Sequence, residues 1–259
     1  MHLPTKSINL KTVKFPQVRL GLQGDPGSGK TTSALTAPNP VVLDIDGGLT
    51  KFSGHDIIVV PIYDYQWVCD YGFEPKKPKA QPNRRDAILK FMQEDALKLT
   101  SEQTLIIDSW TSLQTAFDMQ QDLEPAITKS GQIDEFAFWM RKIEYSEKIM
   151  TYICSLKASV VVTFHELKVR DIKTGQLLEK VQPLMAGKFY SQIKRFFTDF
   201  FRLINEEEKD KEGRVIKCNY YWQVCSDNQF DSKTRLTFPE GTFKVKPDFS
   251  VFSQYERKV

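Results

Sequence analysis

Apolar residues in this chain come in short runs that are separated by glycine, proline and charged residues. In residues 18–22, large apolar side chains alternate with other residues up to the start of a glycine-rich stretch, and this alternation predicts a strand. Residues 41–45, 104–108 and 159–164 are nearly continuous apolar runs, rich in β-branched side chains. Runs of this length and composition are typical of strands that are buried on both faces. Residues 55–62 are a further strand candidate.

Helical spacing of apolar residues separates these strands. It predicts helices over residues 31–36, 84–99, 112–123 and 133–156. Because strands and helices alternate, we expect an α/β fold of three layers around a mostly parallel central sheet.

The end of the chain has a different pattern. Residues 200–204 and 220–224 predict two strands, joined by a charged turn over 206–214, which form a C-terminal antiparallel hairpin. We therefore divide the chain into an N-terminal arm (1–16), one large domain (17–240) and an extended C-terminal tail (241–259).

Composition places the chain among ordinary globular proteins. Of 259 residues, 41% are apolar and 27% charged, and 36 basic against 33 acidic residues give a net charge of +3. This charge allows a local nucleic-acid patch without requiring one. No run approaches the roughly 20 apolar residues of a membrane helix, and the four cysteines form no CxxC pair. We expect a cytoplasmic protein without a membrane partner.

The strongest chemical signal is the glycine-rich stretch after the first strand. It reads Gly-Asp-Pro-Gly-Ser-Gly-Lys-Thr from Gly24 to Thr31 and fits the P-loop pattern GxxxxGK[ST]. Glycines let backbone N–H groups wrap around phosphate oxygens, and the following helix adds its positive end. Lys30 would reach the β- and γ-phosphates of ATP, and the Thr31 hydroxyl would ligate Mg²⁺. The expected nucleotide-binding residues are Gly24, Asp25, Pro26, Gly27, Ser28, Gly29, Lys30, Thr31 and Thr32.

Polar residues follow the other buried strands. Asp108 ends the run 104–108 and is expected to hold Mg²⁺ and its water shell, although an Asp here also fits a helix cap. Asp46 is expected to orient the attacking water, with Asp44 as the second choice and a turn-forming Asp-Gly as the alternative. His165 would sense the γ-phosphate, or would be a structural histidine.

The order of these motifs resembles the RecA-like ATPases, in particular a compact phage branch of AAA-domain ATPases and single-strand annealing proteins. The resemblance covers residues 17–240. It implies that Lys233 and Arg235 reach a neighbouring subunit's nucleotide, so that the protein acts as a homo-oligomer with nucleotide near the interface. Two exposed charges on an edge strand are the alternative. It also implies a DNA-facing segment after His165. The cations of this segment are Lys168, Arg170, Lys173 and Lys180, and a solvated charge-rich hairpin without a DNA role is the alternative.

These features predict a Mg²⁺-dependent ATPase that acts on single-stranded DNA in phage recombination, annealing or replication. A P-loop ATPase that acts on a protein partner without DNA is the main alternative. A small-molecule kinase ranks lowest, because the chain has no arginine-rich lid. ATP and GTP are not distinguished by any visible base-reading motif, and the oligomer size and the polarity on DNA stay open.

Overall fold

The computed structural model describes residues 17–62, 84–121, 130–131, 134–170, 173–177, 180–185 and 187–257. The expected N-terminal arm, residues 1–16, lies outside these ranges. In chain order the strands are β1 (Arg19–Gly24), β2 (Pro40–Asp44), β3 (Ile58–Pro61), β4 (Thr104–Asp108), β5 (Ser159–Leu167), β6 (Gln182–Pro183), β7 (Asp199–Lys209), β8 (Val215–Gln223) and β9 (Lys244–Val245). The α-helices are α1 (Lys30–Ala34), α3 (Arg84–Lys90), α4 (Trp110–Gln121), α5 (Glu135–Ser155) and α6 (Val251–Gln254).

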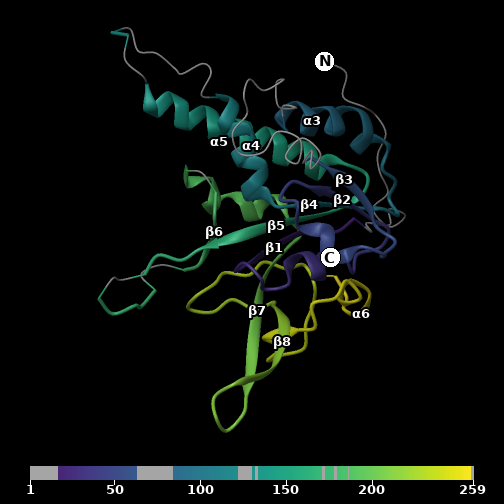
Figure 1. The fold of residues 1–259 in the computed structure, drawn as a ribbon, viewed down its shortest axis with the longest axis vertical. Coiled ribbons are helices and arrows are strands. Elements are labelled where there is room, and N and C mark those ends of the chain that lie inside the picture. The colour runs from purple at the N-terminus through teal and green to yellow at the C-terminus, as the bar shows by residue number, and fades with distance from the viewer. Residues whose placement is uncertain are drawn as a thin grey trace, which may run out of the picture.

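Within the described residues, nine strands form one mixed sheet (Figure 1). Eight of them follow the order β3-β2-β4-β5-β1-β7-β8-β9, and β6 pairs with β5. Pairing is parallel from β3 to β7 and antiparallel between β7, β8 and β9. This confirms the expected three-layer fold with a mostly parallel sheet and a C-terminal antiparallel hairpin. The carboxyl ends of β1, β2, β4 and β5 therefore meet at one edge of the sheet.

The central strands are apolar on both faces because two separate cores cover them. Along β4, Leu105 and Ile107 belong to one core, and Ile106 between them belongs to the other. The first core contains residues of α3, α4 and α5, and the second contains residues of α1 and of the C-terminal segment. Figure 1 shows α3, α4 and α5 together on one side of the sheet and α6 on the other. Successive side chains along each of these strands thus point alternately into the two cores.

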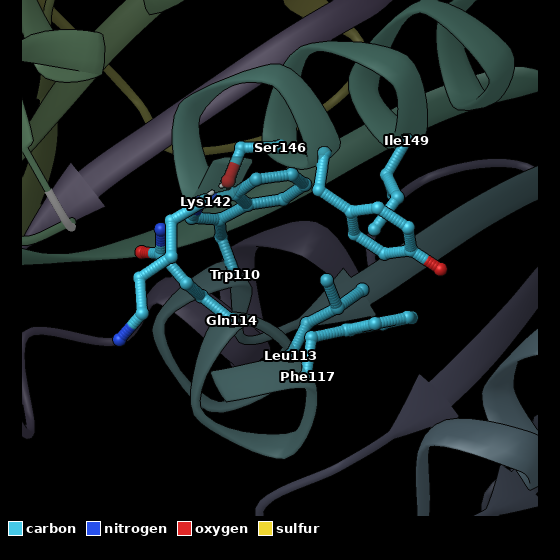
Figure 2. Close-up of a pocket in the computed structure, with 8 residues that line it drawn as sticks. Trp110, Leu113, Gln114, Phe117, Lys142, Ser146 and Ile149 are labelled. Carbon is cyan, nitrogen blue, oxygen red and sulfur yellow. Dashed lines mark hydrogen bonds between the residues drawn. The ribbon is translucent and has the colours of Figure 1, made fainter. Parts of the chain in front are cut away.

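Helices α4 and α5 pack against each other with a small cavity between them (Figure 2). Leu113 and Phe117 of α4 line it with Ile149 of α5, and Gln114 Nε2 donates to Ser146 Oγ at 3.3 Å. The cavity has a volume of about 10 Å³. This volume suits about one water molecule and excludes a nucleotide.

The C-terminal hairpin is longer than the sequence pattern predicted. The first four residues of the expected turn over 206–214 are strand, because β7 continues to Lys209, and β8 begins directly after it at Val215. Glu208 pairs with Lys217 in the register, and its carboxylate accepts a hydrogen bond from Asn219 Nδ2 at 2.7 Å. Charged side chains here remain exposed on a two-stranded ribbon, where cross-strand pairs replace burial. Figure 1 shows this ribbon extending away from the sheet.

The helix expected over 84–99 is not uniform. After α3 the backbone forms a π-helical turn over Phe91–Asp95 and a 3₁₀ turn over Ala96–Lys98. Phe91 and Ala96, five residues apart, are both buried in the first core. Residues five apart align in a π-helix, so the wider turn keeps both side chains inside.

The C-terminal residues pack onto the sheet. Strand β9 pairs with β8, and Val245, Phe249 and Val251 join the second core beside Leu20 and Leu22 of β1. This segment therefore returns to the strand that carries the glycine-rich loop. In the parts of the chain that the structure describes, no helix is both long and apolar enough to cross a membrane.

Candidate active site

The glycine-rich loop connects β1 directly to α1, as its sequence predicts. Gly27 and Gly29 have φ values of 77° and 89°, a region in which a side chain is strained. A Cβ at Gly24 would lie 2.5 Å from Ser28 Oγ. The loop thus needs glycine for its backbone path and for its close internal packing.

Lys30 lies inside this loop. Its ammonium donates to the carbonyl oxygens of Gly24 at 2.9 Å and Asp25 at 2.7 Å. Burial lowers the pKa of Lys30, and the nearby carboxylates, first that of Asp108, oppose this shift. The charge is therefore held at the loop by backbone oxygens and by acidic neighbours.

Asp108 lies between two hydroxyl groups. Thr31 Oγ1 donates to Asp108 Oδ2 at 2.7 Å, and Thr163 Oγ1 donates to Asp108 Oδ1 at 2.6 Å. Thr31 belongs to the P-loop, Asp108 ends β4, and Thr163 lies on the neighbouring β5. Sequence reasoning missed Thr163, although it is the polar residue inside the buried run 159–164.

Asp46 and His165 face each other beside this group. His165 Nε2 lies 3.9 Å from Asp46 Oδ2, and about 30% of each side chain is exposed. Burial tends to raise the pKa of Asp46, but the nearby polar groups of His165, Ser112 and Ser109 outweigh it and hold the pKa below its ordinary value. The carboxylate is therefore charged at neutral pH and accessible from the pocket.

Asp44 has a different environment from Asp46. The strand ends at Asp44, so the expected alternation does not extend to Asp46 and does not place the two on one side. Asp44 is buried, and its Oδ1 accepts a hydrogen bond from the backbone N–H of Gly47 at 2.8 Å. Burial raises the pKa of Asp44. This carboxylate shapes the turn that presents Asp46.

An ion-pair network joins the end of β5 to the P-loop. Glu166, whose side chain is 1% exposed, accepts from Arg202 Nε at 2.7 Å and from Arg202 Nη2 at 3.1 Å. Lys168 Nζ lies 3.2 Å from Glu166 Oε2 and also pairs with Asp25 of the P-loop. A conformational change after β5 would therefore act on the phosphate loop through Lys168.

The other expected DNA-binding cations lie farther along this segment. Arg170 forms an isolated bridge with Leu177, and its guanidinium donates to the carbonyl of Gly175 at 2.8 Å. Lys180 pairs with Asp231 at 2.5 Å. Lys173 lies in the turn between Arg170 and Leu177. In the described residues of this segment, Lys168, Arg170 and Lys180 each contact a partner within the chain.

Lys233 and Arg235 lie away from the P-loop of their own chain. Lys233 forms a bridge with Phe200 near the start of β7, and its ammonium donates to the carbonyl of Lys194 at 2.9 Å. The backbone N–H of Arg235 donates to Asp199 Oδ1 at 3.0 Å. Because β7 runs parallel to β1, this is the sheet edge opposite the carboxyl end of β1.

The P-loop lines a pocket of about 530 Å³. This volume lies within the range of about 300–1,000 Å³ that is typical of small-molecule sites. One side, the acidic wall, consists of Asp46, Asp108 and His165. The other side, the C-terminal wall, consists of Tyr220, Lys246, Pro247 and Asp248. Sequence reasoning missed the C-terminal wall, because no local motif marks these residues.

The residues at the P-loop suit Mg²⁺. Thr31 and Asp108 offer hydroxyl and carboxylate oxygens, which are the hard ligands that Mg²⁺ prefers. Among the described residues there is no group of three or more His, Cys, Asp or Glu that would hold a metal by itself.

Comparison with known families gives the same class of protein. A family model described as an AAA domain matches residues 17–236, which is most of the chain. The chain belongs to this AAA domain family, and the P-loop ATPase class expected from its motifs is confirmed. No curated protein matches the chain.

Proposed function

We propose that this protein hydrolyses ATP with Mg²⁺ at the pocket over the P-loop. The observation that carries the proposal is the position of Asp108, whose carboxylate lies between the hydroxyls of Thr31 and Thr163. Thr31 and Asp108 would hold Mg²⁺, which offsets negative charge on the β- and γ-phosphates. Lys30 would turn from the loop carbonyls toward these phosphates.

Asp46 is the proposed residue that orients water. Its carboxylate lines the pocket, and its pKa is held below the ordinary value by neighbouring polar groups whose effect outweighs burial. It would accept a hydrogen bond from the attacking water, and His165 beside it would respond to the γ-phosphate. Asp44 is less suited, because its carboxylate already accepts from the Gly47 N–H.

We propose that the ATPase binds single-stranded DNA. The residues that would contact the DNA phosphates are Lys168, Arg170, Lys173 and Lys180. Support comes from Lys168, which links this segment to Asp25 of the P-loop. Phosphates that attract Lys168 would weaken its pairing with Asp25 and so couple DNA to nucleotide. Recombination, annealing or replication of single strands are the processes that such coupling serves.

A homo-oligomer is part of this proposal. Lys233 and Arg235 lie at the sheet edge opposite the P-loop of their own chain. Their proposed role at a nucleotide therefore requires a neighbouring copy of the chain. A cation supplied in this way stabilises the charge of the transition state.

A protein partner is the second candidate. Three large side chains on the first half of α5 are exposed: Phe136 (77%), Trp139 (46%) and Met140 (42%). Exposed apolar residues that gather on one helix are typical of protein contacts. This surface would serve a P-loop ATPase that remodels a protein without DNA.

The test is an ATPase assay with and without single-stranded DNA, across protein concentration and salt. We expect DNA to stimulate turnover and turnover per chain to rise with concentration. The double variant Arg170→Ala/Lys173→Ala should reduce the slope of log affinity against log salt by about 1.4, since each lost contact removes about 0.7. Lys209→Ala/Lys211→Ala, on the C-terminal hairpin, is the matched control.

The outcomes separate the candidates. If ATP turnover is the same with and without DNA, and no protein–DNA complex forms at low salt, the DNA role is excluded and the protein partner is favoured. Concentration-independent turnover by a monomer would remove Lys233 and Arg235 from catalysis. Absence of turnover and of ATP binding would exclude the ATPase itself.

A further inference from the structure

The order of strands in the sheet makes the two sides of the pocket different. Strands β5, β4 and β2, which lead to His165, Asp108 and Asp46, lie on one side of β1. Strands β7, β8 and β9 lie on its other side, and the C-terminal wall comes from β8 and from the residues after β9. The P-loop at the end of β1 therefore lies between two walls of different chemistry.

Tyr220 places an aromatic ring against the phosphate loop. A Cβ at Gly29 would lie 3.5 Å from Tyr220 Cδ1 and 3.8 Å from Cε1, so the ring lies directly over this glycine. Tyr220 is nevertheless 39% exposed, and it lines the pocket. Part of a large aromatic ring is thus accessible next to the phosphate site.

The backbone of β8 fixes the direction of this ring. Trp222, two residues farther on the same face of β8, donates from Nε1 to Ser33 Oγ of α1 at 2.7 Å. Tyr221 between them points to the other face, where Lys244 Nζ lies 4.2 Å from its ring centroid. The Trp222 anchor holds β8 against α1 and keeps Tyr220 on the pocket side.

The remainder of the C-terminal wall is also anchored to α1 and the turn after it. The backbone N–H of Phe249 donates to Thr36 Oγ1 at 2.9 Å. Asp248 Oδ1 accepts from the backbone N–H of Ser250 at 2.8 Å, and Lys246 Nζ lies 3.7 Å from Asp248 Oδ2. Lys246, Pro247 and Asp248 are therefore positioned along the same edge of the pocket as Tyr220.

We propose that the C-terminal wall binds the base and ribose of the nucleotide, with the base stacked on the Tyr220 ring. This rests on the proposed function, because it takes the acidic wall as the γ-phosphate end. A nucleotide whose γ-phosphate faces Asp46, Asp108 and His165 extends its base toward the opposite wall. An aromatic face suits any base, since every base offers a π-surface.

The test compares two ligands that share phosphates and differ in the base. Equilibrium binding of Mg-ATP and of inorganic tripolyphosphate is measured by calorimetry for the wild type and for Tyr220→Ala. We expect ATP binding to weaken about 5-fold to 100-fold, as for loss of a stacked base, with tripolyphosphate binding unchanged. Tyr220→Phe keeps the ring and should bind ATP like the wild type.

Tyr221→Ala is the matched control, since it removes the same side chain from the opposite face of β8. An equal loss of ATP and tripolyphosphate binding in Tyr220→Ala would overturn the proposal, because the ring would then only support Gly29. Unchanged ATP binding would overturn it as well. A wild type that binds neither ligand would instead remove the proposed ATPase function.

Discussion

The two walls of the pocket are built in different ways. The acidic wall consists of side chains at or just after the carboxyl ends of adjacent parallel strands, where one edge of the sheet brings them together. The C-terminal wall comes from an antiparallel strand and from a segment near the end of the chain, and both are attached to α1 and the turn after it. The first wall follows from strand order and local motifs, whereas the second depends on long-range packing.

The anchors of the two walls also differ. In the acidic wall, hydroxyl groups fix the Asp108 carboxylate at 2.6 and 2.7 Å, so the functional atoms themselves are held. In the C-terminal wall, the hydrogen bonds hold Trp222 and the backbone of Phe249, which are neighbours of the wall residues in the chain and not wall residues themselves. Changes in the acidic wall should therefore alter chemistry, and changes in the C-terminal wall should alter binding.

Lys30→Ala should have the largest effect, because Lys30 lies between the two walls. We expect ATP affinity to fall by about 100-fold or more, as when one partner of a buried charge contact is lost. The measurement is ATP binding by calorimetry, with folding checked by thermal unfolding. Lys98→Ala, at an exposed lysine paired with Asp95, is the control and should bind normally. Retained affinity would show that the loop does not bind phosphates.

Asp46→Asn should separate catalysis from binding within the acidic wall. We expect kcat to fall by about 100-fold to 10,000-fold, the usual contribution of a positioned base, while ATP affinity stays within a few-fold. Because the pKa of Asp46 is held low by the polar groups around it, wild-type turnover should not decline between neutral pH and pH 5 through protonation of this residue. Normal turnover in the variant would assign the water to another group.

Thr163→Val should loosen the acidic wall without removing a proposed ligand. The variant keeps the shape of the side chain but deprives Asp108 Oδ1 of its donor, so Mg²⁺ affinity should fall about 10-fold to 100-fold. A magnesium titration of the ATPase rate measures this. Thr104→Val is the control on β4, because Thr104 Oγ1 is buried without a hydrogen-bond partner among the described residues and its removal should cost nothing. Equal magnesium requirements in both variants would contradict the role of Thr163.

Asp44→Asn should have the smallest effect and concerns the turn beneath the acidic wall. Burial raises the pKa of Asp44 in the folded state, so this group makes the protein less stable as pH rises from its unfolded pKa, about 4, through its folded pKa. Asn keeps an acceptor for the Gly47 N–H and carries no charge. The variant should therefore be at least as stable as the wild type at pH 7, and this advantage should vanish below about pH 4.

Denaturant unfolding at several pH values measures this stability. Asp44→Ala, which also removes the acceptor for Gly47, should be less stable than Asp44→Asn by about 1 kcal/mol. If both variants are equally destabilised, the turn depends on the charge of Asp44 and not on its hydrogen bond.

Several features could be predicted from the sequence because they are local. The P-loop, the strand that precedes it and the position of Asp108 follow from short patterns whose geometry depends on adjacent residues. The length of the C-terminal hairpin could not, because its charged residues resemble a turn and only cross-strand pairing makes them strand. The choice between Asp44 and Asp46 also required the structure, since it depends on where β2 ends.

Three features follow from the order of amino acids alone: the phosphate loop, the strands that are apolar on both faces, and the alternation of strands and helices that produces a parallel sheet. Each of these depends on residues within a few positions of one another, so elementary propensities suffice. The folded chain was needed to show that Thr163 holds Asp108, that Lys168 pairs with Asp25 and that the Tyr220 ring packs against Gly29. The first two contacts lie at pairs of neighbouring strands, and the third reaches from β8 past β7 to the loop after β1. All three join residues that are distant in the chain, and no local pattern carries that information.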